Sequence, residues 1–152
     1  MKIIPNPKRV RRGDIFGFEL RNGKWVVGIV IHISKIFTSA MLISFFDKEY
    51  DSPDDISVDS LGDQMIIIGR KSLPNYTGKA ILTKGPFKYL GNYPEIAYSI
   101  PLPVLGQGRA YYRGDDVIDI SEVDDEEYLG PIIGLGLLSI EEDLFEYFKR
   151  NR

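Results

Sequence analysis

The stretch RRGDIFGFELRNGKWVVGIV, residues 11–30, is the part of the sequence that decides the fold. Its Asn22-Gly23 pair is a strong β-hairpin signal, because both residues tolerate the positive φ angles of a two-residue type I′ turn. Such a turn predicts that Leu20 lies opposite Trp25. The large apolar side chains of both strands then share one face of the hairpin, namely Phe16, Phe18, Leu20, Trp25, Val27, Ile29 and Ile31.

The same register places Gly17 opposite Gly28 and predicts a bare patch on the second face, as occurs at a sharp bend or a close backbone approach. His32 is the single histidine and falls on that second face. Ser34 and Ser44 are candidate nucleophiles only because they lie nearby in the sequence. A lone strand histidine without a positioned nucleophile and acid is typical of a structural residue. We therefore expect no catalytic residue, no bound cofactor and no metal site.

The rest of the chain predicts further short strands and one terminal helix. Residues 139–149, SIEEDLFEYFK, are predicted to be helical, with Ser139 as the N-cap and Glu142 completing a capping box. The apolar stripe of this helix is formed by Ile140, Leu144 and Phe148. The other expected elements are strands at residues 25–37, 40–46, 64–69 and 79–84, and a long loop at residues 47–63.

These elements predict a mainly β fold, bordering on α+β: a small, strongly bent antiparallel β-barrel or half-barrel with a C-terminal helix. The length of 152 residues is that of one domain, and 43% apolar residues suffice for a core. We expect a single domain over residues 1–152. Within it, residues 1–12 form an extended basic arm, because Pro5 and Pro7 oppose a helix.

The charges are distributed unevenly along the chain. Residues 1–24 carry 7 Lys/Arg and 2 Asp/Glu (+5), residues 25–112 carry 8 of each, and residues 113–152 carry 4 Lys/Arg and 12 Asp/Glu (−8), which gives the net charge of −3. An acidic chain with a pI of 5.2 lacks the broad basic surface of nucleic-acid-binding proteins, so we expect no nucleic-acid partner. The absence of cysteine excludes disulfides and thiol chemistry.

The most acidic stretch is DDVIDISEVDDEE, residues 115–127. It lacks the mid-loop glycine of a calcium loop and has apolar residues where calcium ligands should fall. Clustered carboxylates attract a basic partner and accelerate the encounter with it. The sequence therefore predicts a partner-binding surface made of eight carboxylates: Asp115, Asp116, Asp119, Glu122, Asp124, Asp125, Glu126 and Glu127.

Residues 10–31, VRRGDIFGFELRNGKWVVGIVI, resemble the N-terminal signature of the immunity protein 26 family of bacterial polymorphic toxin systems. A later stretch at residues 66–74, IIIGRKSLP, resembles the second apolar strand of the family. The matching residues of the first stretch are Gly13, Asp14, Ile15, Phe16, Gly23, Lys24, Trp25 and Gly28. The resemblance implies a non-catalytic, cytoplasmic antitoxin without a cofactor. Such a protein binds and neutralises a cognate toxin, for example a basic nuclease, in systems such as contact-dependent inhibition.

Two other functions remain open on the sequence. Endoribonuclease toxins of the plasmid-maintenance type share the basic-Gly-Asp-Ile opening, but they continue with a longer loop and an Arg-Pro pair where this chain has Asn22-Gly23. The other alternative is a small β-barrel module that binds nucleic acid or peptides. No apolar run reaches membrane-spanning length, and residues 1–5 do not begin a signal peptide. We therefore expect a cytoplasmic protein with no membrane partner, and its oligomeric state is left open.

Overall fold

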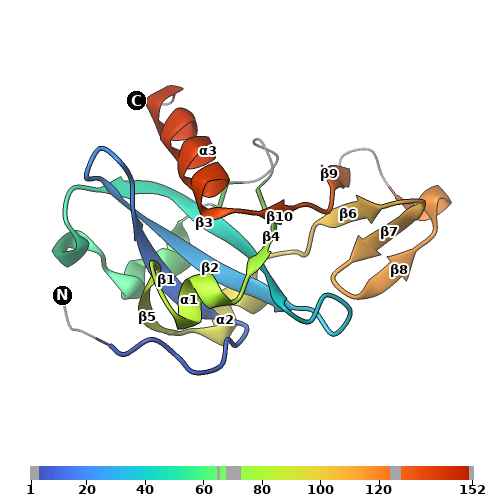
Figure 1. Ribbon diagram of the computed structural model, residues 1–152, viewed down its shortest axis with the longest axis horizontal. Helices are drawn as coiled ribbons and strands as arrows, with labels where there is room; N and C mark the ends of the chain where they lie inside the picture. Colours follow the sequence, from blue (N-terminus) through green and yellow to red (C-terminus); the bar gives the residue numbers. More distant parts are fainter. Residues whose placement is uncertain (1–3, 65, 68–72, 124–127, 151–152) are drawn as a thin grey trace.

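The computed structural model describes residues 4–64, 66–67, 73–123 and 128–150, and in these ranges ten strands form two sheets (Figure 1). The order of the large sheet is β10-β4-β3-β2-β1-β5, and that of the small sheet is β8-β7-β6-β9. The strands of the large sheet are β1 (Asp14–Glu19), β2 (Trp25–Ile33), β3 (Ala40–Tyr50), β4 (Asn75–Gly78), β5 (Lys88–Asn92) and β10 (Gly134–Leu135). The strands of the small sheet are β6 (Val104–Gln107), β7 (Ala110–Arg113), β8 (Asp116–Ile118) and β9 (Tyr128–Pro131).

Short helices connect the strands, and one longer helix ends the described chain. The α-helices are α1 (Ala80–Thr83), α2 (Pro94–Tyr98) and α3 (Leu137–Arg150), and the 3-10 helices are Pro53–Asp55, Val58–Asp63 and Ile120–Glu122. The predicted mainly β fold with a bent sheet and a C-terminal helix is confirmed. The large sheet has β10 and β5 as its edges in the described chain, so it is open rather than closed into a barrel. The pairs β10–β4 and β6–β9 are parallel, in addition to the antiparallel pairs that we expected.

The turn of the first hairpin differs from the prediction by one residue. Leu20 pairs with Lys24 through a 2.8 Å hydrogen bond from the Leu20 amide to the Lys24 carbonyl, so the loop has three residues instead of two. Gly23 adopts a φ of 81°, and the Asn22 side chain accepts a 3.1 Å hydrogen bond from the Lys24 amide. A three-residue loop with glycine in the left-handed conformation is a common hairpin connection, and it competes with the type I′ turn for the same Asn-Gly pair.

This shift changes which side chains share a face, because a one-residue slip turns every side chain of a strand to the opposite side. Glu19 pairs with Trp25, and Phe16 pairs with Gly28. The predicted opposition of Gly17 and Gly28 is therefore wrong. A Cβ atom on Gly28 would lie 2.4 Å from the Phe16 ring, and one on Gly17 would lie 3.4 Å from the Trp25 ring. Gly28 thus makes room for the Phe16 ring, whereas a Cβ atom on Gly17 would be in ordinary van der Waals contact with the Trp25 ring, so neither glycine leaves a bare patch.

The large sheet is covered on both faces, which explains why β2 and β3 are apolar at nearly every position. The first core lies on one face under α1 and α3, and it includes Phe16, Phe18, Val30, Phe45, Leu82, Phe87 and Leu144. The second core lies on the other face with α2 and the small sheet, and it includes Ile15, Trp25, Val27, Ile29, Leu61, Ala97 and Leu105. In the first core, the rings of Phe16 and Phe87 stack with their centroids 4.2 Å apart.

Several predicted boundaries move in the structure. The predicted strand at residues 79–84 is wrong, because β4 ends at Gly78 and the chain then turns into α1, which buries Leu82 in the first core. A short apolar run such as residues 80–82 fits a helix or a strand equally well. Strand β2 ends at Ile33 instead of residue 37, and β3 continues into the predicted loop. Of the predicted strand at residues 64–69, Ile66 forms an isolated bridge with Phe46, and residues 65, 68 and 69 lie outside the described residues.

Helix α3 begins two residues before the predicted N-cap. The Ile140 amide donates a 3.0 Å hydrogen bond to the Gly136 carbonyl, so Ser139 is inside the helix and is not its cap. The predicted apolar stripe is confirmed, since Ile140, Leu144 and Phe148 are the buried residues of the helix. Helical periodicity therefore predicted the buried face correctly, whereas the capping pattern placed the start too late.

Candidate partner-binding surface

The predicted acidic surface lies on and after the β7–β8 hairpin, at the end of the molecule formed by the small sheet (Figure 1). The turn of this hairpin contains Gly114, whose φ is 62°. A Cβ atom at this position would lie 2.9 Å from the Leu102 side chain and 3.3 Å from the His32 ring. The tight turn thus rests directly on the end of strand β2, and glycine is needed both for its backbone conformation and for this close approach.

Asp115 fastens this turn to the large sheet. Its carboxylate accepts a 2.7 Å hydrogen bond from the Ser34 hydroxyl and a 2.9 Å hydrogen bond from the Lys35 amide. His32 Nε2 lies 3.2 Å from the same carboxylate in a geometry that suits an electrostatic contact better than a hydrogen bond. Partial burial raises the pKa of Asp115, but the hydrogen bonds from Lys35 and Ser34 and the contact with His32 outweigh it and lower the pKa below its ordinary value.

The candidate nucleophiles Ser34 and Ser44 and the candidate base His32 have structural roles. The Ser34 hydroxyl donates to Asp115 and accepts from the backbone amides of Ile36 and Phe37, at 3.0 and 2.8 Å. The Ser44 hydroxyl is buried and donates to the Ile67 carbonyl at 2.8 Å. In the described chain, neither serine hydroxyl donates a hydrogen bond to His32, although general-base activation would require one.

His32 lies on the opposite face of β2 from the one we predicted. The register of β2 against β3 shifts between Val30 and His32, because Val30 pairs with Ile43 while His32 pairs with Leu42. Such a bulge places one extra residue in β2 and turns the following side chains over. His32 consequently meets the Gly114 turn of the small sheet. A bulge of this kind leaves no mark in the hydrophobic pattern of the strand.

The remaining described carboxylates of the acidic segment are exposed. Asp116, Asp119 and Glu122 are all on the surface. Asp119 accepts hydrogen bonds of 2.9 Å from both the amide and the hydroxyl of Ser121, which lower its pKa, and this local cap leaves the side chain exposed. Val117 lies between them on β8, the edge strand of the small sheet, with 68% of its surface accessible. Asp124, Asp125, Glu126 and Glu127 lie outside the described residues.

Helix α3 carries other acidic residues of the C-terminal third, and two of them share the single positive charge of Arg21. The Arg21 guanidinium donates to Glu141 at 2.7 Å and to Glu142 at 2.6 Å. These bonds raise the pKa of Arg21, and the bond from Arg21 lowers the pKa of Glu141 despite partial burial of that carboxyl. The strong negative charge of residues 113–152 is therefore less available on α3 than the sequence suggests.

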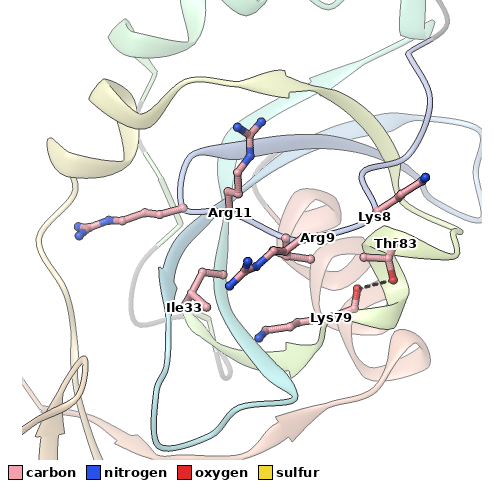
Figure 2. Close-up of a pocket in the computed structure, with 8 residues that line it drawn as sticks. Lys8, Arg9, Arg11, Ile33, Lys79 and Thr83 are labelled. Atoms are coloured by element: carbon pink, nitrogen blue, oxygen red, sulfur yellow. Dashed lines mark hydrogen bonds between the residues drawn. The ribbon is translucent and has the colours of Figure 1, made fainter.

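A second charged feature could be predicted only in part from the sequence. We call it the basic pocket, a hollow of about 640 Å³ between the N-terminal arm and the start of α1 (Figure 2). It is lined by Lys8, Arg9, Val10, Arg11, Arg12, Ile33, Lys79 and Thr83. The sequence shows the cluster in the arm, but the contribution of Lys79 and Thr83 depends on long-range packing.

Among the described residues, no group of three His, Asp or Glu side chains is placed to hold a metal ion.

A family model described as Immunity protein 26 matches residues 11–117, which is more than half of the chain. The chain therefore belongs to the Immunity protein 26 family, and membership supports an immunity role. Neither a curated protein nor a solved structure gave a match.

The region matched by the family model includes only part of the acidic segment. It contains both strands of the first hairpin and runs as far as Val117 in β8. Asp115 and Asp116 therefore lie inside the region shared with the family, and the acidic residues from Asp119 onward lie outside it. None of the helices in the described ranges has the length and hydropathy of a membrane-spanning segment.

Proposed function

We propose that this protein is a non-catalytic immunity protein that binds and neutralises a cognate toxin in the bacterial cytoplasm, within a polymorphic toxin or contact-dependent inhibition system. The observation that carries the proposal is membership in the Immunity protein 26 family over residues 11–117. The structural roles of Ser34, Ser44 and His32 are consistent with inhibition by binding. An immunity protein needs only to cover its toxin's active site or block access to the substrate.

We assign the toxin-binding surface to the acidic segment after β7. In this proposal Asp115 positions the surface, because its carboxylate is held by Ser34 and Lys35. Asp116, Asp119 and Glu122 contact the partner, since they are exposed around the accessible edge strand β8. The sequence adds Asp124, Asp125, Glu126 and Glu127 to the same segment.

A basic toxin, such as a nuclease, is the partner that this surface fits. A nuclease needs cationic side chains to hold the phosphates of its substrate. Clustered carboxylates on the immunity protein would attract those cations, accelerate association and occupy the surface that the substrate needs. Exposed Val117 would supply apolar contact at the centre of the acidic residues.

The test measures capture of the toxin encoded by the neighbouring gene. A triple variant, Asp116→Lys with Asp119→Lys and Glu122→Lys, is compared with a control, Asp47→Lys with Asp55→Lys and Asp59→Lys. Each variant replaces three exposed carboxylates and changes the net charge from −3 to −3 + 6 = +3. In the control, Asp55 and Asp59 lie on 3-10 helices away from the small sheet (Figure 1).

We expect the association rate constant of the first variant to fall about tenfold or more, and that of the control to fall much less. Reversal of Asp124, Asp125, Glu126 and Glu127 to lysine is expected to act like the first variant. Raising the salt concentration to about 0.5 M should reduce the wild-type rate and remove the differences between variants. Equal rates for all variants would exclude the acidic surface, while failure of the wild-type protein to bind the toxin or protect cells would exclude the immunity function.

A further inference from the structure

The basic pocket is a built feature and not a loose cluster of charges. The arm is held where it passes over the large sheet, because Val10 is buried in the first core and the Gly13 amide donates to the Val30 carbonyl at 2.8 Å. The Arg11 amide donates to Asp14 at 2.8 Å. The buried Asp14 carboxylate also accepts bonds from Tyr89 and Asn92. The basic side chains of the arm therefore extend from a backbone with a defined path.

The pocket joins cations that are far apart in the sequence. Figure 2 shows the side chains of Arg9 and Lys79 extending toward the same region beside Ile33, whereas Lys8 and Arg11 point outward around it. Lys79 precedes α1, and its ammonium group donates a 2.6 Å hydrogen bond to the Thr38 carbonyl. Because an ammonium group has three donors, this bond leaves others for a ligand.

The positive charge of the pocket is not compensated by its own lining. None of the described residues that line it is acidic. Among the described residues, Lys8 and Arg9 make no ion pair. The Arg12 guanidinium lies 4.1 Å from the centre of the Tyr98 ring, and its buried Nε has no hydrogen-bond partner in the described part of the chain. Like charges gathered in one hollow repel one another, so an anion bound among them would be stabilised.

We propose that the basic pocket binds a phosphate-bearing ligand with at least two negative charges, and that Arg9 and Lys79 contact its oxygens. A concave site of this volume fits a compact ligand. Arginine and lysine are the side chains that proteins use for phosphate, through the fork of a guanidinium and the point charge of an ammonium. The lining, as far as the structure describes it, has no aromatic residue on which a base could stack, so affinity comes from the phosphates. This site is separate from the acidic surface and does not depend on the proposed function.

The experiment measures binding of pyrophosphate to the full-length protein by calorimetry, with citrate at matched ionic strength as a polycarboxylate probe. The test variant is Arg9→Gln with Lys79→Gln. The matched control is Arg109→Gln with Lys84→Gln, since both residues are exposed and neither lines the pocket. Denaturation midpoints in urea are measured for both variants, so that a loss of binding is not confused with a loss of folding.

We expect pyrophosphate to bind the wild-type protein saturably at one site and more tightly than citrate. The dissociation constant should rise at least about tenfold in the test variant and change less than about twofold in the control. A short oligonucleotide without terminal phosphates distinguishes the source: displacement of pyrophosphate by it assigns the site to a nucleic-acid backbone, and no displacement assigns it to a free phosphate compound. Absence of saturable binding, equal binding of citrate, or equal loss in both variants would overturn the proposal.

Discussion

Gly28 has no side chain, and the ring of Phe16 fills the space that one would need. A Cβ atom there would lie 2.4 Å from the Phe16 ring and 3.0 Å from the Phe45 ring. Phe16 in turn stacks on Phe87 and meets Phe45 edge-on, with centroids 5.6 Å apart. A single missing side chain on β2 therefore allows three aromatic rings to pack in the first core.

We predict that Gly28→Ala lowers the free energy of unfolding by about 1–3 kcal/mol, the usual cost of forcing extra atoms into a packed core. Urea denaturation monitored by circular dichroism measures the change. Gly62→Ala is the control, because no atom of the described residues lies within 4 Å of a Cβ atom at that position. Combining Gly28→Ala with Phe16→Leu should cost less than the sum of the two single changes, since the smaller side chain leaves room for the new methyl group. Additive costs would show that the clash with Phe16 is not the cause.

At the scale of elements, the first hairpin and α3 interact through apolar packing and through ion pairs. The apolar stripe of α3 packs into the first core beside Phe18 and Leu20. On the surface above it, Arg21 in the hairpin loop binds Glu141 and Glu142. The ion pairs are exposed and contribute little, because solvent screens them and ordering the side chains has an entropic cost. The apolar stripe accounts for most of the docking energy of the helix.

Two identical substitutions on α3 separate these contributions. We predict that Leu144→Ala lowers the free energy of unfolding by about 2–5 kcal/mol, because Leu144 is fully buried and the change leaves a cavity. Leu138→Ala, six residues earlier, should change it by less than about 0.5 kcal/mol, because 85% of Leu138 is exposed. Urea midpoints measure both. Similar losses at the two positions would show that burial of Leu144 in the first core is not what stabilises α3.

At the scale of the whole molecule, Asp115 connects the two sheets. It lies between β7 and β8 of the small sheet, and its hydrogen-bond donors, Ser34 and Lys35, follow β2 of the large sheet. The same residue thus belongs to the acidic segment by sequence and to the junction between the sheets by structure. Any partner that binds Asp116 and its exposed neighbours would meet a surface whose position is set by this junction.

We predict that Asp115→Asn lowers the free energy of unfolding by about 1–2 kcal/mol at neutral pH, because hydrogen bonds to a charged acceptor are stronger than those to an amide. The pKa of Asp115 is depressed below its ordinary value of 3.8, so its contribution is complete above that pH and is lost as the pH falls through the depressed value. The difference between wild-type and variant should therefore shrink in acid. Asp116→Asn, exposed and adjacent, is the control. A difference that does not change with pH would show that charge is not what matters at position 115.

Local patterns determined a large part of this fold. Alternating and continuous apolar runs predicted β1, β2 and β3, and periodicity predicted the buried stripe of α3. Both signals arise from neighbours in the sequence, and the burial of an apolar side chain depends mainly on its own chemistry. The signature around Gly13 and Trp25 also sufficed to recognise the Immunity protein 26 family. The uneven distribution of charge along the chain also follows directly from the sequence, and it identified both the basic arm and the acidic segment.

Tertiary structure decided between alternative local conformations where the sequence fits more than one. The Asn22-Gly23 pair fits a loop of two or three residues, and packing of the Phe16 ring against Gly28 accompanies the longer one. The bulge before His32, the use of Asp115 as a junction and the meeting of Arg9 with Lys79 likewise depend on residues distant in the chain. Sequence by itself thus determined which residues are apolar, charged or able to turn. Only the folded chain decided which of them meet, because those contacts are selected by the energy of the whole packing and not by any local segment.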